Sequence, residues 1–278
     1  MKVLHVAATL YFGLCLPFTS SAQSQDLLED VSFNDVLALP TSEPHARLAY
    51  GTDEFQYGLL WLPEDVSSPP PLVVFIHGGC WLNSFDITHS NALSSQLSQE
   101  GFAVWSLEYR RTGDPGGGWP GSFEDIKDGI GFLNELAEYG IDTERFAIVG
   151  HSAGGHLALL AGTQFPEATQ IISLAGITNI ALYARGETSC EQAAVQFMGA
   201  TPRENPNLYS LANPASQELH IDSILLHGEA DSIVPLSQAA RSGLPVLRLP
   251  GAGHFDWIHS GTYGYTYLLE LLQARLLP

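Results

Sequence analysis

Short apolar runs alternate with amphipathic stretches along most of the chain. The sequence LVVFI at 72–76 is an example, bounded by prolines on one side and by His-Gly-Gly on the other. Uninterrupted apolar runs of this length are typical of parallel strands that are covered on both faces. We expect such strands at 72–76, 103–107, 146–149, 171–174, 224–226 and 246–249, preceded by two further strands at 46–50 and 55–62.

Helical patterns separate these runs. Alternation of β and α at this spacing is typical of βαβ crossovers, so the pattern predicts an α/β fold with a doubly wound, mostly parallel sheet. The interval 178–222, rich in Asn, Pro and Ser, breaks the alternation, and we expect an insertion over the sheet's edge that shapes a pocket. The polar segment 23–43 is expected to be loosely held. Helices are expected at 91–99, 123–139, 152–163, 236–242 and 262–277.

The first 22 residues differ in composition from the rest. Lys2 precedes the almost wholly apolar stretch 3–18, and the small residues at 20–22 follow it. This pattern predicts a secretory signal peptide, whose apolar part is too short for a stable membrane span; a buried first helix is the alternative. We therefore expect an exported protein, periplasmic or secreted, with a single domain over residues 23–278 and no membrane span.

The charge of the chain excludes some classes of partner. The 278 residues include 11 Lys and Arg against 30 Asp and Glu, a formal net charge of −19. An acidic surface repels phosphate groups, so we expect neither a nucleic-acid partner nor attachment to anionic membranes. The charge itself names no substrate.

A candidate nucleophile lies where an expected strand meets an expected helix. The sequence Gly-His-Ser-Ala-Gly occupies positions 150–154, directly after the strand at 146–149. A strained turn at such a junction exposes a serine, and the N-terminus of the following helix favours a developing negative charge. The glycines at 150, 154 and 155 indicate closer packing than a simple tight turn needs. We therefore predict that Ser152 is a nucleophile.

The strand at 72–76 runs into a second candidate element, His77 followed by two glycines. Glycines allow consecutive backbone N–H groups to face a pocket, and an oxyanion requires donors of this kind. We expect the N–H groups of Gly79, Cys80 and Ala153 to form an oxyanion hole. His77 is expected to orient this loop by hydrogen bonding, and a simple Gly-Gly turn is the alternative.

Two late motifs supply the remaining groups. A serine hydroxyl becomes reactive when a histidine takes its proton, and that histidine needs a carboxylate to fix its tautomer. Asp231 lies in HGEADSIVP and His254 in PGAGHFDW, each after an expected strand. The order serine, acid, histidine is the one expected for a nucleophile elbow on such a sheet. Glu229 is the alternative acid, and His259 is the alternative base.

Three other residues have structural interpretations. His151 and His156 flank the elbow and are expected to pack or to support the reacting groups. Arg110 follows the strand at 103–107, and we expect it to form a buried ion pair with Asp125 or Asp128 rather than to bind substrate.

Together these motifs resemble the α/β-hydrolases, over nearly the whole chain after residue 22. The His-Gly-Gly loop, the segment Tyr109-Arg110-Arg111, the Gly-His-Ser-Ala-Gly-Gly elbow and the His-Gly-x-x-Asp-x-x-Val-Pro motif are similar to the branch of hormone-sensitive-lipase-like carboxylesterases and kynurenine-formamidase-like enzymes. The resemblance implies the α/β-hydrolase fold and cleavage of an acyl bond through an acyl-serine intermediate. Ser152 would be the nucleophile, His254 the general acid and base, and Asp231 its orienting partner.

The function expected from this resemblance is hydrolysis of small or medium carboxylic esters by a serine carboxylesterase. An amide hydrolase of the kynurenine-formamidase type uses the same residues and is the first alternative. A peptidase and a non-catalytic binding protein are less favoured, because no gating domain accompanies the core and no catalytic residue is missing. The sequence contains no metal-ligand or phosphate-loop motif, so no cofactor and no metal are expected.

Two pairs of interpretations stay open for the cysteines and the tryptophans. Related loops commonly carry Gly or Ala where Cys80 stands. In an oxidising compartment, Cys80 and Cys190 could form a disulfide that ties the His-Gly-Gly loop to the insertion, and two free thiols are the alternative. Trp81, Trp119 and Trp257 either line the substrate pocket or belong to the core.

Overall fold

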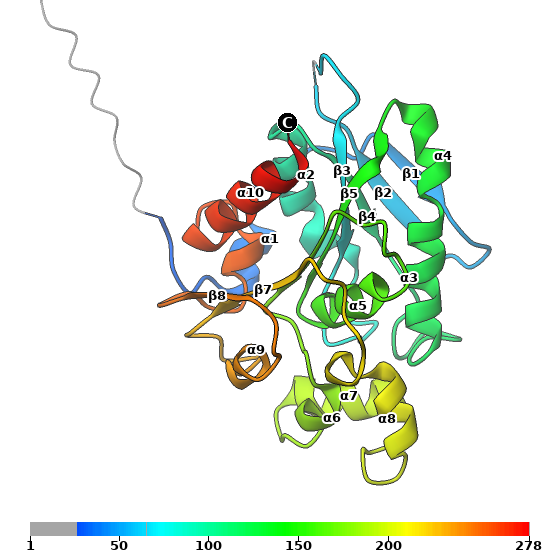
Figure 1. Cartoon of the computed structure of the whole chain (residues 1–278), viewed down its shortest axis with the longest axis vertical. Coiled ribbons are helices and arrows are strands. Elements are labelled where there is room, and N and C mark those ends of the chain that lie inside the picture. The colour runs from blue at the N-terminus through cyan, green and yellow to red at the C-terminus, as the bar shows by residue number, and fades with distance from the viewer. Residues whose placement is uncertain (1–26, 65, 278) are drawn as a thin grey trace, which may run out of the picture.

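The computed structural model describes residues 27–64 and 66–277, and the signal peptide predicted at 1–22 lies outside the described residues. An eight-stranded sheet forms its centre, in the order β1-β2-β4-β3-β5-β6-β7-β8 (Figure 1). β2 pairs antiparallel with β1 and β4, whereas the neighbours from β4 to β8 are parallel. The strands are β1 (Ala46–Ala49), β2 (Tyr57–Trp61), β3 (Pro71–Ile76), β4 (Ala103–Leu107), β5 (Asp142–His151), β6 (Gln170–Leu174), β7 (Ser223–Gly228) and β8 (Val246–Leu249).

Helices follow most of the strands, and 3-10 turns lie at 87–90, 137–139, 214–216 and 256–258. Within the described ranges, no helix combines the length and the apolar composition that crossing a membrane requires. The helices are α1 (Phe33–Leu37), α2 (Asn91–Gln99), α3 (Gly121–Gly131), α4 (Leu133–Leu136), α5 (Ala153–Gly162), α6 (Ile180–Tyr183), α7 (Ser189–Met198), α8 (Pro206–Ala212), α9 (Ser237–Ala240) and α10 (Tyr263–Leu276).

Alternate residues of the central strands face opposite helical layers. In β3, Leu72 and Val74 belong to the core layer that contains α3 and α5, whereas Val73 and Phe75 belong to the layer that contains α2 and α10. Figure 1 shows α3 on one side of the sheet and α10 on the other. Both faces are therefore buried, which is why the strands appear in the sequence as continuous apolar runs. The predicted mostly parallel sheet with helices on both faces is confirmed.

One predicted helix is wrong in its continuity. The pattern over 123–139 predicted a single helix, but α3 ends at Gly131, and a short α4 and a 3-10 turn continue the segment to Tyr139. Gly129 packs so closely on the Leu107 side chain that a Cβ would lie 2.7 Å from it. Two glycines at 129 and 131 also weaken the helix, because glycine is among the poorest helix formers.

The interval 178–222 forms α6, α7 and α8. Figure 1 shows these three helices together at one end of the molecule, next to α5. His156 on α5 bonds through Nε2 to the main-chain carbonyl of Ala212 at the end of α8, over 2.7 Å. This buried contact attaches the interval to α5 beside the elbow, consistent with the packing role expected of His156.

Candidate active site

Ser152 lies on a sharp turn between β5 and α5. Its φ of +56° and ψ of −119° are unusual for a residue with a side chain. The surrounding glycines permit this turn through close contact. A Cβ on Gly150 would lie 2.1 Å from the carbonyl oxygen of Gly154, and a Cβ on Gly154 would lie 2.1 Å from that of Ile76. The glycines of the motif are therefore required by packing, as the sequence indicated.

The structure brings Asp231 and His254 together on the loops that follow β7 and β8. Asp231 Oδ2 lies 2.8 Å from His254 Nδ1. Asp231 Oδ1 accepts hydrogen bonds of 2.8 Å from the N–H groups of Ile233 and Val234. The carboxylate is fully buried, so its two oxygens have separate and fixed partners. Nε2 of His254 bonds to no described residue and is left for the cavity.

Ser152 and His254 line one cavity of about 350 Å³. Larger hollows on the described surface contain neither residue. The alternative acid and base, Glu229 and His259, do not line the cavity. Its walls are formed by Phe33, Gly79, Cys80, Phe85, His89, His151, Ser152, Cys190, Ile233, His254 and Phe255.

The loop after β3, residues 77–87, borders this cavity, and we call it the oxyanion loop. A Cβ on Gly78 would lie 3.0 Å from the Cβ of Ser152, so the loop passes directly against the elbow. Gly79 and Cys80 both have positive φ, +102° and +52°. Their N–H groups form no hydrogen bond with any part of the chain that the structure describes. Ala153 is the first residue of α5, and N–H groups in a first helical turn lack helical partners.

A disulfide joins Cys80 to Cys190, with 5.2 Å between their Cα atoms. Cys80 belongs to the oxyanion loop and Cys190 to α7, and both line the cavity. Of the two arrangements left open for these cysteines, the structure contains the bridged one. The disulfide therefore links the oxyanion loop covalently to the insertion at the wall of the cavity.

A family model described as BD-FAE matches residues 60–242, which is more than half of the chain. The chain belongs to the BD-FAE family. Esterase LipC of Mycobacterium tuberculosis is 28% identical over 79% of this chain, and Esterase LipQ of the same organism is 27% identical over 90%. The chain spans only 62% and 66% of the length of these two relatives.

Solved structures agree with this family at the level of the fold. A truncated carbohydrate esterase from gut microbiota has a TM-score of 0.73 at 20% identity, over 86% of this chain and 98% of that one. Esterase B from Lactobacillus Rhamnosis has a TM-score of 0.71 at 19% identity, over 87% of this chain and 89% of that one. The predicted α/β-hydrolase fold of this BD-FAE chain is confirmed.

The tryptophans do not line the cavity of this BD-FAE member, which corrects one of the two interpretations above. The side chains of Trp81 and Trp257 are fully buried in the core. Trp81 stacks on Phe197 at 5.0 Å between ring centroids, and Trp119 stacks on Phe123 at 5.5 Å. All three indoles therefore contribute to packing.

Phenylalanines supply the aromatic wall instead. The rings of Phe85 and Phe255 lie 5.8 and 5.6 Å from that of Phe33, in edge-on and tilted arrangements. Phe33 was missed because it lies in the segment that we expected to be loosely held. The capping box formed by Ser32 and Asp35 at the start of α1 is the local signal that could have located this helix.

The first described residues are not loosely held, because they are hydrogen-bonded to the segment around Asp256. The buried carboxylate of Asp256 accepts hydrogen bonds from the N–H groups of Asp30 and Val31, at 3.0 and 2.9 Å. Asp256 is two residues after His254. The contact therefore places α1, and Phe33 with it, beside the loop that carries His254.

Two further histidines line the cavity of the BD-FAE chain. Burial, with the neighbouring His77, lowers the pKa of His89 to about 3, and burial holds the pKa of His151 well below its usual value. His151 bonds through Nε2 to the main-chain carbonyl of His254, over 2.9 Å. Both imidazoles are uncharged at neutral pH. Among the described residues, no Asp, Glu, Lys or Arg lines the cavity.

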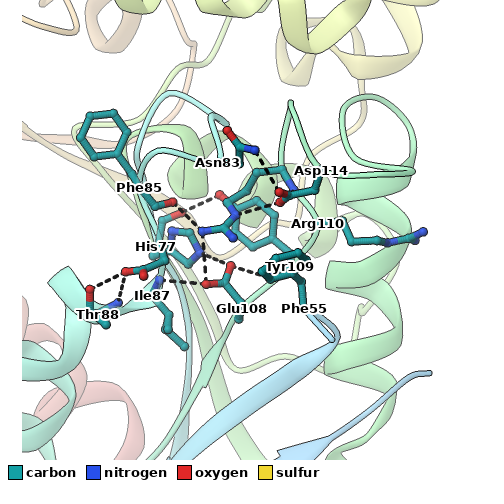
Figure 2. A network of polar contacts seen from close by, with 12 residues as sticks. Phe55, His77, Asn83, Phe85, Ile87, Thr88, Glu108, Tyr109, Arg110 and Asp114 are labelled. Carbon is teal, nitrogen blue, oxygen red and sulfur yellow. Dashed lines mark hydrogen bonds and ion pairs between the residues drawn. The ribbon is translucent and has the colours of Figure 1, made fainter. Parts of the chain in front are cut away.

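Two polar predictions are confirmed outside the cavity. Arg110 forms a two-pronged ion pair with the buried Asp125, at 2.6 and 2.8 Å. His77, the first residue of the oxyanion loop, hydrogen-bonds through Nδ1 with the carbonyl of Gly78 in the same loop. Its Nε2 contacts Glu108 (Figure 2). Glu108 was not singled out from the sequence, although it directly follows an expected strand.

Proposed function

We propose that this chain is a serine carboxylesterase that cleaves esters of small or medium acyl groups through an acyl-serine intermediate. One observation carries the proposal. Ser152, on its elbow, shares a cavity with His254. The buried carboxylate of Asp231 contacts Nδ1 of that histidine, which leaves Nε2 available to Ser152.

In the acylation step, Nε2 of His254 takes the proton of the Ser152 hydroxyl as its oxygen attacks the ester carbonyl carbon. Asp231 stabilises the imidazolium that forms. The carbonyl oxygen becomes an oxyanion and accepts hydrogen bonds from Gly79, Cys80 and Ala153, which strengthen as negative charge develops. His254 then gives its proton to the leaving alcohol, and the acyl group remains on the serine.

In the deacylation step, water replaces the alcohol. His254 takes a proton from the water as its oxygen attacks the acyl carbon, and the same three N–H groups stabilise the second oxyanion. The Ser152 oxygen leaves and regains a proton from His254. The products are the carboxylic acid and the original enzyme, and no cofactor is consumed.

The walls of the cavity support a small, neutral acyl group. The volume of about 350 Å³ lies near the lower end of the range for ligand pockets. The described residues of the cavity walls are largely aromatic and aliphatic. They include no charged side chain other than the proposed catalytic histidine when it is protonated. The names of LipC and LipQ favour an ester over an amide.

We also propose that the protein is exported. The composition of residues 1–22 supports this, as does the disulfide between Cys80 and Cys190, because disulfides persist mainly in oxidising compartments. Secretion would place the enzyme with extracellular or periplasmic small-molecule esters.

The test is hydrolysis by the purified protein of aryl esters of increasing acyl length, beside N-formyl and N-acetyl anilides. We expect ester turnover that is highest for short chains and is lost in Ser152→Ala. Ser94→Ala, at a buried serine of α2, serves as the matched control and should retain turnover. A preference for the anilides would assign the enzyme to amide hydrolysis. Turnover unchanged in Ser152→Ala would contradict the proposal.

A further inference from the structure

The oxyanion loop is held by a second segment, residues 108–114, which we call the supporting segment. β3 and β4 are parallel neighbours with Ile76 opposite Leu107. His77 follows β3 and Glu108 follows β4. The two segments therefore leave the carboxyl ends of neighbouring strands side by side. Figure 2 shows the polar contacts between them.

Glu108 binds both ends of the oxyanion loop. Its Oε1 lies 3.0 Å from Nε2 of His77, and its Oε2 accepts a hydrogen bond of 3.0 Å from the N–H of Ile87. The side chain is 1% exposed. Burial alone would raise the pKa of Glu108, but His77 and Arg111 outweigh burial and lower it. Glu108 is therefore an ionised group with a fixed partner for each oxygen.

Arg111 binds the oxyanion loop at Phe85. Its Nη1 donates a hydrogen bond of 2.8 Å to the carbonyl of Phe85 and lies 3.4 Å from Glu108 Oε2. Its Nε lies 3.3 Å from Asp114 Oδ2. The guanidinium is 3% exposed, so it is a buried charge that both carboxylates balance.

Phe85 in turn supports Gly79, whose N–H is one of the proposed oxyanion donors. Gly79 has a φ of +102°, and a Cβ at this position would lie 2.4 Å from the Cβ of Phe85. The main chain of Gly79 therefore rests directly on Phe85. The ring of Phe85 also lines the cavity.

We propose that Glu108 and Arg111 are positioning residues, which hold the Gly79 and Cys80 N–H groups where the oxyanion forms. This inference rests on the proposed function. Neither side chain lines the cavity, so both act through the oxyanion loop. Displacement of well-placed groups by about 1 Å costs on the order of a hundredfold in rate, which sets the size of the expected effect.

The kinetic test compares Arg111→Met with Arg110→Met. Arg110 is the adjacent residue and is also ion-paired, but with Asp125 on α3 rather than with the oxyanion loop. We expect kcat per active site, counted by fluorophosphonate titration, to fall about tenfold to a hundredfold in Arg111→Met. KM for a short acyl ester should change less than threefold. Arg110→Met should keep kcat within threefold of the wild type.

The conservative variants keep this test decisive. Arg111→Lys retains the charge but cannot make the guanidinium contacts in full, so its kcat should lie between those of the wild type and Arg111→Met. Glu108→Gln keeps the shape but cannot accept at both oxygens, and it should behave like Arg111→Met. If Arg111→Met does not fold, the same comparison is made with these two variants.

Amide hydrogen exchange supplies a readout that does not depend on activity. We expect exchange of the N–H groups in residues 77–87 to become at least about tenfold faster in Arg111→Met and unchanged in Arg110→Met. α10 should be unaffected in both variants. Unchanged exchange in the loop, or a kcat per active site that equals the wild type, would overturn the positioning role. Absence of ester turnover in the wild type would instead overturn the proposed function, and the exchange data would then show only whether Arg111 holds the loop in place.

Discussion

At the scale of single residues, each proposed catalytic group is held by a specific neighbour. Asp231 shows this most directly, because main-chain N–H groups occupy Oδ1 and leave Oδ2 for His254. The carboxylate thereby keeps the proton on Nδ1 and leaves Nε2 free to accept one. This geometry identifies Asp231, rather than Glu229, as the acid. The chain order of the motifs predicted Asp231 but could not show the contact.

Asp231→Asn should reduce kcat about 10³- to 10⁴-fold with little change in melting temperature. The amide keeps the shape but can donate to Nδ1, which moves the ring proton to Nε2 and blocks transfer from Ser152. Steady-state kinetics on a short aryl ester measures the loss. Asp222→Asn, at a partly exposed aspartate that pairs with Arg275, is the control and should retain activity. A loss below tenfold in Asp231→Asn would show that another acid orients His254.

At the scale of elements, strands and helices were predictable where the signal is local. β4 and β8 occupy the predicted residues, because a glycine lies shortly before each run and Pro250 and Gly251 follow β8. α1 was missed although its capping box is a local signal. Its position beside His254 was not predictable, because its anchor Asp256 lies 225 residues from Val31 in sequence. Long-range packing also explains why phenylalanines line the cavity where tryptophans were considered. The sequence shows which residues are aromatic but not which of them the core buries.

α1 should therefore contribute to acyl selectivity. Phe33→Ala removes one side of the aromatic wall, and we expect the preferred acyl chain to become longer while KM for the shortest ester rises. The ratio of kcat/KM values across a series of acyl lengths measures this shift. Leu37→Ala, at an exposed residue of the same helix, is the matched control. An unchanged acyl profile in Phe33→Ala would mean that the acyl group does not reach α1.

The disulfide between the oxyanion loop and α7 should stabilise both the fold and the site. Replacing Cys80 and Cys190 together by Ala should lower the free energy of unfolding by about 2–4 kcal/mol, because the bridge closes a loop of 110 residues in the unfolded chain. We also expect a lower kcat. Urea unfolding and ester kinetics with and without a thiol reductant provide the measurement. The reductant should lower the stability and kcat of the wild type and leave those of the double variant unchanged. Equal effects of the reductant on both proteins would contradict the role of the disulfide.

At the scale of the whole molecule, buried histidines make stability depend on pH. Burial lowers the pKa of His156 to about 4, below the value of about 6.5 in the unfolded chain. The unfolded state binds more protons between these values, so stability is fully present above pH 6.5 and is lost as the pH falls toward 4. His89, with a pKa of about 3, acts in the same direction.

Urea unfolding at pH 7.5 and pH 5.0 tests this dependence. The wild type should lose stability at the lower pH, and His156→Gln should lose about 2 kcal/mol less between the two conditions. Glutamine can still donate to the carbonyl of Ala212 but does not take up a proton. His45→Gln, at an exposed histidine, should show the full loss. A loss in His156→Gln equal to that of the wild type would contradict the assignment.

The central claim is that His254 and the elbow activate Ser152. The most direct measurement is mass spectrometry of the protein after reaction with a fluorophosphonate, beside His254→Ala and Ser152→Ala. We predict a single phosphonyl adduct on the peptide that contains Ser152, slow labelling in His254→Ala and no labelling in Ser152→Ala. No adduct on the wild type, or an adduct on another serine at the same rate, would contradict the account.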